Sequence, residues 1–406
     1  MKLEKILSVG IALLLIQACS HPLEIEGDGD ITSASATRDC PLEEFLAGED
    51  SCSKNYVVGA YNETYTATPR VGWVFDHWDN YCPNIPDNQC TFSVTAEQVV
   101  QFWGLSVPPL RAVFSRYKLT GPILPDSENA IRPPYLGSLG YQGKEFFLAG
   151  NARSYTPTLP LPTDGKLVVT PDPETVDGNY KTRLVVFRPI EPADFNGTVI
   201  VEWFNVTAQI DTNPDWIMAH NEFIREGYVY VGVSAQSVGV NALINSSERY
   251  SSLVHPGDSY SYDIFSRAGQ LAGEASAELL GGLTADRVIA TGESQSASRL
   301  VTYINAVHPL ANVYDGFMVH SRGSSGSAIS QSPLPYYPNP SPAPIRDDLA
   351  EPVMVMQAED DTIRSNLATR QPDTSMFRLW ELAGSTHADA YTLLGINDNG
   401  DGSADV

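Results

Sequence analysis

The chain of 406 residues is poor in basic side chains, with 25 lysines and arginines against 49 aspartates and glutamates. The net charge of −24 repels nucleic acids and anionic surfaces, so nucleic acid is excluded as a partner and polyanionic substrates are disfavoured. The sequence has no glycine-rich phosphate loop, which leaves nucleotide and redox chemistry without support. Its five cysteines form no CxxC pair, so no zinc site is expected, and we predict no metal or other cofactor.

The apolar run near the N-terminus, residues 6–16, is too short to cross a membrane, which takes about 20 residues. It follows Lys2 and Lys5 and leads into Ile16-Gln17-Ala18-Cys19. This order resembles a bacterial lipoprotein signal peptide, residues 1–18, with Cys19 as the lipidated residue. The serine after Cys19 implies, by the same resemblance, an outer-membrane lipoprotein of the cell envelope, anchored to the membrane by its lipid. A plain secretory signal, and a secreted protein, is the alternative.

The other four cysteines are even in number and confined to the first quarter of the chain, which is typical of disulfides in an oxidising compartment. Three pairings are possible. We expect the local one, Cys40 with Cys52 and Cys82 with Cys90, because it closes short loops.

Composition divides the rest of the chain into three parts. Residues 19–38 are acidic, polar and rich in glycine, serine and threonine, which predicts a flexible tether. Residues 39–117 carry short apolar runs between turn residues, which predicts a small all-β domain held by the two disulfides. The expected strands are 56–58, 64–66, 73–75, 91–94 and 112–114. The stretches ATPRVGWVFDHWDNYC, CTFSV and RAVF resemble a divergent internalin-type repeat of bacterial surface proteins, which implies a spacer or adhesive module without catalytic residues.

From residue 118 to residue 406, strand patterns alternate with helical ones, which predicts an α/β domain with a mostly parallel sheet flanked by helices. The expected helices are 215–225 and 260–280. The expected strands are 181–187, 198–204, 228–233, 287–290, 316–320, 353–357 and 377–382.

A candidate nucleophile follows the strand at 287–290. The sequence Gly292-Glu293-Ser294-Gln295-Ser296 leads directly into a helical pattern, as a Gly-x-Ser-x-Gly nucleophile elbow does. Ser296 replaces the final glycine, but it is small enough for the turn. Ser294 is therefore the predicted nucleophile, and the backbone N–H of Gln295 is one predicted oxyanion donor. Ser234 also follows a strand, but no clear helical pattern follows it, and we interpret it as a loop serine.

In this fold the order of the triad is serine, acid, histidine. Three histidines follow Ser294, and His387 is the predicted base because it lies in a glycine-containing loop directly after the last strand. His308 is interpreted as a helix-end residue, and His320 could line the pocket.

The acid should follow the strand at 353–357. Glu359, Asp360 and Asp361 all qualify by position; Asp361 is favoured, Glu359 is the alternative, and those of the three that do not orient the histidine are expected to be solvated loop charges. The second oxyanion donor is expected just after the strand at 198–204, at Asn205, with Val206 as the other candidate.

Five stretches, VEWFNV, HPGDSYSYDIFSRAGQ, GESQSASRLVTYINAV, YDGFMVHSRG and RQPDTSMFRLWELAGSTHAD, together resemble a bacterial α/β-hydrolase-domain family. The resemblance supports Ser294 and His387 by position and leaves Asp361 and Glu359 open. It implies a serine esterase that cleaves a small-molecule or carbohydrate-linked carboxylic ester through an acyl-enzyme. An acyltransferase with the same triad and a non-catalytic surface-binding lipoprotein are the alternatives. No protein partner is indicated.

Overall fold

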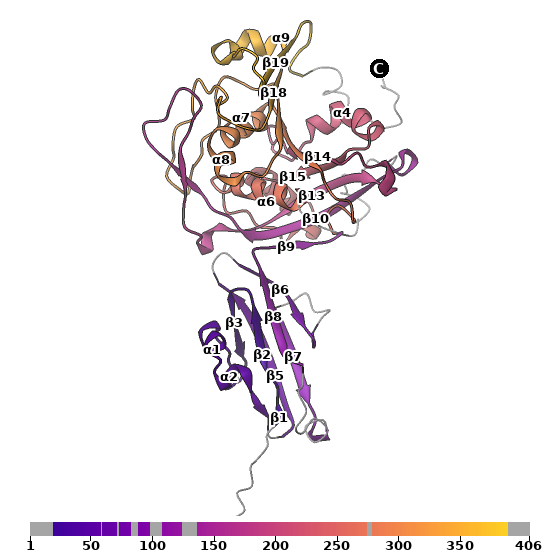
Figure 1. Ribbon diagram of the computed structural model, residues 1–406, viewed down its shortest axis with the longest axis vertical. Coiled ribbons are helices and arrows are strands. Elements are labelled where there is room, and N and C mark those ends of the chain that lie inside the picture. The colour runs from indigo at the N-terminus through magenta and orange to yellow at the C-terminus, as the bar shows by residue number, and fades with distance from the viewer. Residues whose placement is uncertain are drawn as a thin grey trace, which may run out of the picture. The chain divides into compact units, whose positions relative to one another are not determined.

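The structure is a computed structural model, and it describes residues 19–57, 59–70, 73–82, 88–97, 108–123, 136–273 and 278–388. The expected signal peptide, residues 1–18, lies outside the described residues. The chain forms two compact units, Met1–Ser115 and Arg116–Val406, which are described one at a time (Figure 1). Across the part of the chain that the structure describes, no helix is both long enough and apolar enough to cross a membrane.

The first unit contains two three-stranded sheets and one two-stranded pair. The strands of the first sheet, in spatial order, are β2 (Leu23–Glu26), β8 (Leu110–Ser115) and β6 (Val74–Asp79). Those of the second are β3 (Gly29–Ser33), β5 (Tyr61–Pro69) and β7 (Gln89–Val94). The remaining pair is β1 (Cys19–Ser20) with β4 (Tyr56–Val57). Two short helices, α1 (Leu42–Ala47) and α2 (Asp50–Ser53), also belong to the described part of this unit, and the all-β expectation did not include them.

The prediction of a flexible tether at residues 19–38 is wrong, because this segment supplies strands to both sheets. β2 pairs in parallel with β8, and β3 pairs antiparallel with β5. Leu23 and Ile31 are fully buried in the core of the unit. Alternate apolar side chains therefore outweigh the polar composition of the segment, since each strand needs only one buried face.

The two local disulfides, Cys40–Cys52 and Cys82–Cys90, are confirmed. All four cysteines are buried, and they pack with Trp78 in the core of this unit. Bridges that close loops this short each contribute on the order of 2–3 kcal/mol. A small domain with a core of limited size gains a large share of its stability from them.

The second unit is built on a nine-stranded sheet (Figure 1). In spatial order its strands are β19 (Phe377–Leu382), β18 (Val353–Ala358), β17 (Gly316–His320), β16 (Arg287–Glu293), β14 (Thr198–Trp203), β15 (Val229–Val233), β13 (Asn179–Pro189), β10 (Tyr141–Asn151) and β9 (Tyr117–Thr120). The six strands from β19 to β15 are parallel, and β13, β10 and β9 join antiparallel. The predicted mostly parallel sheet is confirmed, and all seven predicted strands belong to it; β9 and β10 were not predicted.

The helices of this unit lie on both faces of the sheet. They are α4 (Pro214–Arg225), α5 (Ser237–Ser246), α6 (Ser261–Gly273), α7 (Gln295–Thr302), α8 (His308–Ala311) and α9 (Glu359–Asp361). Short turns of 3-10 or π helix occur at Leu136–Leu139, Val176–Gly178, Pro192–Asp194, Glu248–Tyr250, Tyr303–Val307, Thr362–Asn366 and Leu367–Thr369, and a small hairpin joins β11 (Tyr155–Pro157) to β12 (Val169–Pro171). The helix expected at 260–280 is shorter, because residues 278–280 form a turn.

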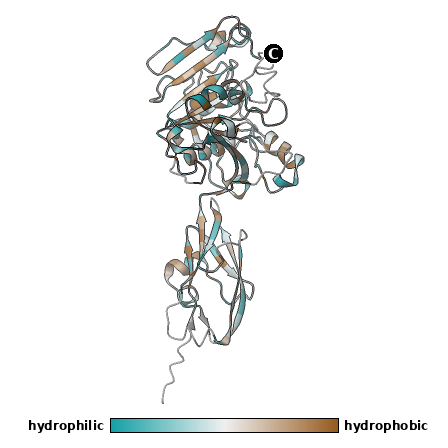
Figure 2. Ribbon diagram, turned by 90° about the vertical axis from the view of Figure 1, so that its right-hand side faces the viewer, coloured by the Kyte–Doolittle hydropathy of each residue, from teal (hydrophilic) through white to brown (hydrophobic). Residues whose placement is uncertain are grey.

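Two apolar layers hold the helices to the sheet. Phe265 of α6 and Leu300 of α7 belong to the large core cluster on one face. Trp216 of α4 packs on Phe187 and Tyr230 on the other face. The sequences of the central strands are continuous apolar runs, because helices cover both faces of the sheet. Figure 2 shows brown, hydrophobic segments along strands of the sheet, next to teal segments on strands and helices alike.

Candidate active site

Ser294 is the single residue between the end of β16 at Glu293 and the start of α7 at Gln295. Its backbone has φ 56° and ψ −110°, a conformation that costs a non-glycine residue on the order of 1–3 kcal/mol. The turn is tight at its base, because a Cβ added to Gly292 would lie 3.2 Å from the backbone of Ser296. This is the strained strand-to-helix turn that a nucleophile elbow requires.

Ser296, which departs from the glycine of the motif, is fully buried and closes the turn by hydrogen bonds. Its hydroxyl accepts from the N–H of Glu293 at 3.1 Å and donates to the carbonyl of the same residue at 2.9 Å. The N–H of Ser294 donates to the carbonyl of His320 at 3.0 Å, which ties the elbow to β17. The serine at position 296 therefore fits in place of the glycine of the motif, and its two hydrogen bonds to Glu293 stabilise the turn.

The side chains of Ser294, His387 and Asp361 form a continuous hydrogen-bonded chain. Ser294 Oγ lies 2.8 Å from His387 Nε2, and His387 Nδ1 lies 2.7 Å from Asp361 Oδ1. Ser294 comes from the elbow, Asp361 from α9 directly after β18, and His387 from the loop after β19. The carboxyl ends of neighbouring parallel strands bring the three groups to one edge of the sheet.

The other two acids of α9 hold the loop of His387 rather than its ring. Asp360 accepts a hydrogen bond from the backbone N–H of His387 at 2.8 Å, and Glu359 accepts from the N–H of Gly384. Of the two candidates for the acid, the structure therefore places Asp361 on the imidazole and Glu359 on the backbone. Glu359 is exposed, as expected of a solvated charge, and Asp360 is half-buried, but both also bind backbone N–H groups of the loop and so fix its path.

The hydrogen bond that His387 donates to Asp361 raises the pKa of His387, against the opposing effect of burial. Burial favours a neutral Asp361, but hydrogen bonds from His387 and Ser321 outweigh it and lower the pKa of Asp361. The pair thus favours a charged carboxylate beside an imidazole that readily takes up a proton. These are the properties of a general base held by an acid.

A buried polar cluster lies beneath the elbow and was not predicted. Glu293 Oε1 lies 3.6 Å from His387 Nε2, and Asn205 donates to Glu293 Oε2 at 3.1 Å. His320 pairs with Asp215 of α4 at 3.0 Å, and Thr291 donates to the same carboxylate at 2.7 Å. Charged residues inside buried strands, as in VEW and GES, were the available signal for it.

Asn205 is wrong as the second oxyanion donor. Its backbone N–H donates to the carbonyl of Thr212 at 3.0 Å, because the loop after β14 folds back on itself. Its side-chain amide donates to the carbonyl and the carboxylate of Glu293. The other candidate, Val206, has its N–H 3.3 Å from Oε1 of Gln295, the residue that begins α7.

The rival serine and histidine have other partners. Ser234 is fully buried, donates to Asp211 and accepts from Arg183 at 3.2 Å. His308 begins α8 and pairs with Glu351 at 3.0 Å. Neither side chain belongs to the chain of contacts at Ser294.

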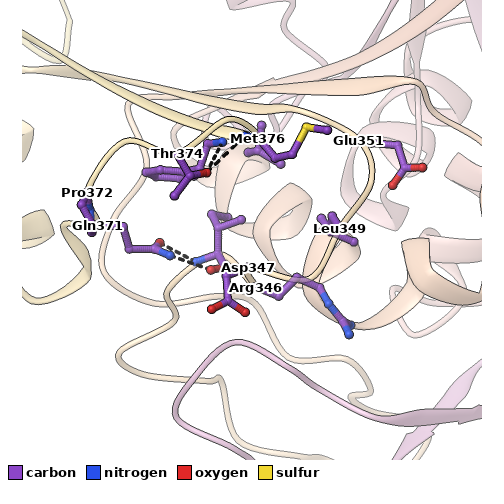
Figure 3. Close-up of a pocket in the computed structure, with 11 residues that line it drawn as sticks. Arg346, Asp347, Leu349, Glu351, Gln371, Pro372, Thr374 and Met376 are labelled. Carbon is purple, nitrogen blue, oxygen red and sulfur yellow. Dashed lines mark hydrogen bonds between the residues drawn. The ribbon is translucent and has the colours of Figure 1, made fainter.

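A hollow lined by Ile345, Gln371, Thr374 and eight neighbours opens elsewhere, at the first residues of β18 and β19 (Figure 3). The triad lies at the other ends of these strands. Two polar side chains of the hollow are bound to backbone: Gln371 exchanges hydrogen bonds with Ile345 at 2.8 and 2.7 Å, and Thr374 accepts from Met376 at 3.1 Å. We assign no function to it. Within the described ranges, no three or more His, Cys, Asp or Glu side chains are grouped as metal ligands.

Comparison with known proteins gives the family. The profile of the α/β-hydrolase domain matches residues 113–405. No curated protein matches the chain. Among solved structures, the esterase Est22 shares 13% identity over 64% of this chain and 77% of its own, with a TM-score of 0.33. A dienelactone hydrolase from Anabaena variabilis shares 13% over 54% and 89%, with a TM-score of 0.32. Since the family match covers most of the chain, this protein belongs to the α/β-hydrolase domain family.

Proposed function

We propose that the protein is a serine hydrolase that cleaves a carboxylic ester through an acyl-enzyme, with Ser294, His387 and Asp361 as its triad. The observation that carries the proposal is the unbroken contact from Ser294 Oγ through His387 to Asp361, at 2.8 and 2.7 Å. The strained elbow supports it, since strain at a non-glycine residue persists where the surrounding structure and function require it.

The mechanism follows from these contacts. Ser294 Oγ attacks the carbonyl carbon, its proton passes to His387 Nε2, and the carbonyl electrons move onto oxygen. The resulting oxyanion faces the first N–H groups of α7, beginning with Gln295, where the helix dipole favours negative charge. We propose Val206 as the second donor; its N–H becomes available when the Gln295 side chain gives way to substrate.

The second half of the reaction restores the enzyme. The oxyanion collapses, the bond to the alcohol oxygen breaks, and His387 gives its proton to that oxygen. Water, deprotonated by His387, then attacks the acyl-enzyme, and the acid leaves with regeneration of Ser294. Asp361 holds the ring in the required tautomer and stabilises the imidazolium. The net charge of −24 favours a neutral small-molecule or carbohydrate-linked ester over an anionic one.

A fluorophosphonate probe tests the nucleophile directly, because it reacts with activated serines. We expect it to label the purified protein on the peptide that contains Ser294, as read by mass spectrometry. The probe should label heat-denatured protein much less, since activation depends on the folded contact with His387. Labelling of Ser234, or of no serine, would contradict the assignment.

We also propose that the protein is an envelope lipoprotein attached through Cys19. The two disulfides support an oxidising compartment, where such proteins reside. Cells fed a radiolabelled fatty acid should incorporate it into the wild-type protein and not into Cys19→Ser. A secreted, unlipidated wild-type protein would refute the anchor and leave the hydrolase proposal untouched.

A further inference from the structure

Glu293 carries a carboxylate at the elbow that has no part in the mechanism above. It precedes the nucleophile in sequence, and its side chain is only 7% exposed. Ionisable side chains are rarely buried without a role or a partner, because desolvation of the charge is costly. Its neutral partner is Asn205, whose amide donates to Oε2 at 3.1 Å and to the Glu293 carbonyl at 3.0 Å.

Because Asn205 anchors Oε2, the other oxygen of Glu293 is directed at the imidazole. Oε1 lies 3.6 Å from His387 Nε2, the nitrogen that also faces Ser294 Oγ at 2.8 Å. A separation of 3.6 Å is too long for a hydrogen bond, so Glu293 does not compete with the serine for the proton. It is short enough for a strong charge interaction in a partly buried site.

We propose that Glu293 is a positioning residue for His387 that stabilises its imidazolium from the Nε2 side, opposite Asp361. The inference rests on the hydrolase function proposed above. During acylation the imidazole gains a positive charge shared by both ring nitrogens. Asp361 meets that charge at Nδ1, and Glu293 meets it at Nε2 without accepting the proton, which stays available for the leaving alcohol.

The charged groups around Glu293 decide when it is ionised. Asp215 on α4, His320 on β17 and His387 itself face it, and Glu202 of β14 lies behind Asp215, whose N–H it accepts at 3.0 Å. Burial and the charge of Asp215 raise the pKa of Glu293 to about 7, against the lowering effects of His387, His320 and Asn205. Burial lowers the pKa of His320, but its hydrogen bond to Asp215 and the nearby carboxylate charges together outweigh burial and raise that pKa.

Ionisation of Glu293 shifts the pH at which His387 loses its proton. As pH rises through about 7, Glu293 loses its proton and the new negative charge favours the protonated form of His387. The base therefore becomes neutral at higher pH than it would beside an uncharged residue, and the two groups titrate as a pair. Without the charge of Glu293, the acid limb of the rate profile moves to lower pH.

The test compares wild type with Glu293→Gln, which keeps the size and the acceptor for Asn205 but never ionises. The readouts are kcat/KM for a short p-nitrophenyl ester and the rate of fluorophosphonate labelling, from about pH 5 to about pH 9. We expect the midpoint of the acid limb to fall by roughly half a pH unit to one pH unit. The variant removes the negative charge of Glu293 that lies 3.6 Å from the half-exposed ring of His387. The rate on the plateau should fall up to about tenfold.

Glu351→Gln is the matched control, since Glu351 also pairs with a histidine, His308, away from the elbow. It should leave the midpoint of the acid limb unchanged. If Glu293→Gln does not fold, as judged by circular dichroism, Asn205→Ala replaces it. Loss of the Asn205 donor raises the pKa of Glu293 and keeps it neutral to higher pH, so the midpoint moves the same way.

The outcomes separate the two proposals. A wild-type protein that is not labelled at any pH overturns the hydrolase function. Wild type labelled on Ser294, together with a folded Glu293→Gln whose midpoint is unchanged, overturns only the role of Glu293. A purely structural role would lower the amount of folded protein without moving the pH midpoint.

Discussion

Ser294→Ala is expected to lower the turnover of a short p-nitrophenyl ester by roughly 10⁴- to 10⁶-fold. Ser294 Oγ is the atom that bonds to the acyl carbon. It is also the hydroxyl that lies 2.8 Å from His387 Nε2, so the variant leaves the base without its hydroxyl partner in the triad. The residual rate would come from water held near His387 and from the oxyanion donors. The measurement is initial rate against substrate concentration, normalised to folded protein.

The stability of this variant should stay close to that of wild type while its activity falls. Alanine keeps the strained backbone and removes only the hydroxyl that contacts His387, so the melting temperature should stay within a few degrees of wild type. Loss of activity together with loss of folding would therefore fail to support the assignment. An unchanged turnover would refute Ser294 as the nucleophile.

Ser234→Ala is the informative comparison. Ser234 also follows a strand, but its hydroxyl is bound to Asp211 and Arg183 inside the protein. Its removal leaves Asp211, which is buried, with one fewer donor, so a lower melting temperature is expected. Turnover per folded molecule should remain near that of wild type, because no contact joins this serine to His387.

The elbow could be predicted because everything that makes it is contiguous. A strand, a glycine, a serine and an apolar helix face lie within about twenty residues, and Leu300, Val301 and Ile304 all enter the core as their spacing indicates. His387 could be predicted as the base from the order of the triad along the chain and from its position after the last strand. Spacing favoured Asp361 but left Glu359 open as the acid, because both lie on the single turn of α9 and differ in the direction of their side chains.

The predictions that were wrong have a common physical origin: they depend on contacts between residues that are not adjacent in the sequence. β2 lies in a segment of polar composition and is stabilised by pairing with β8, more than 80 residues later. Asn205 was excluded as an oxyanion donor by a bridge to Thr212 that the loop makes with itself. The buried group of Glu293, Asp215 and His320 depends on which strands and helix are neighbours in space. Local patterns do not encode any of these arrangements.

Asp361→Asn is expected to lower kcat by roughly 10⁴-fold, the second-largest effect. Asparagine can take the same place, 2.7 Å from His387 Nδ1, but its amide can donate to that nitrogen and so favour the wrong tautomer, with the proton on Nε2. It also removes the main cause of the raised pKa of His387, so the acid limb of the remaining activity should lie at lower pH. The measurement is kcat over a range of pH.

Glu359→Gln provides the matched control on the same turn of helix. Glu359 is exposed and accepts a hydrogen bond from the backbone N–H of Gly384, which a glutamine oxygen can also accept. Its kcat should therefore stay within about threefold of wild type, with the same pH midpoint. If the two variants were reversed, with Glu359→Gln inactive and Asp361→Asn active, the acid of the triad would be Glu359, and the contact between Asp361 and His387 would have no role in turnover.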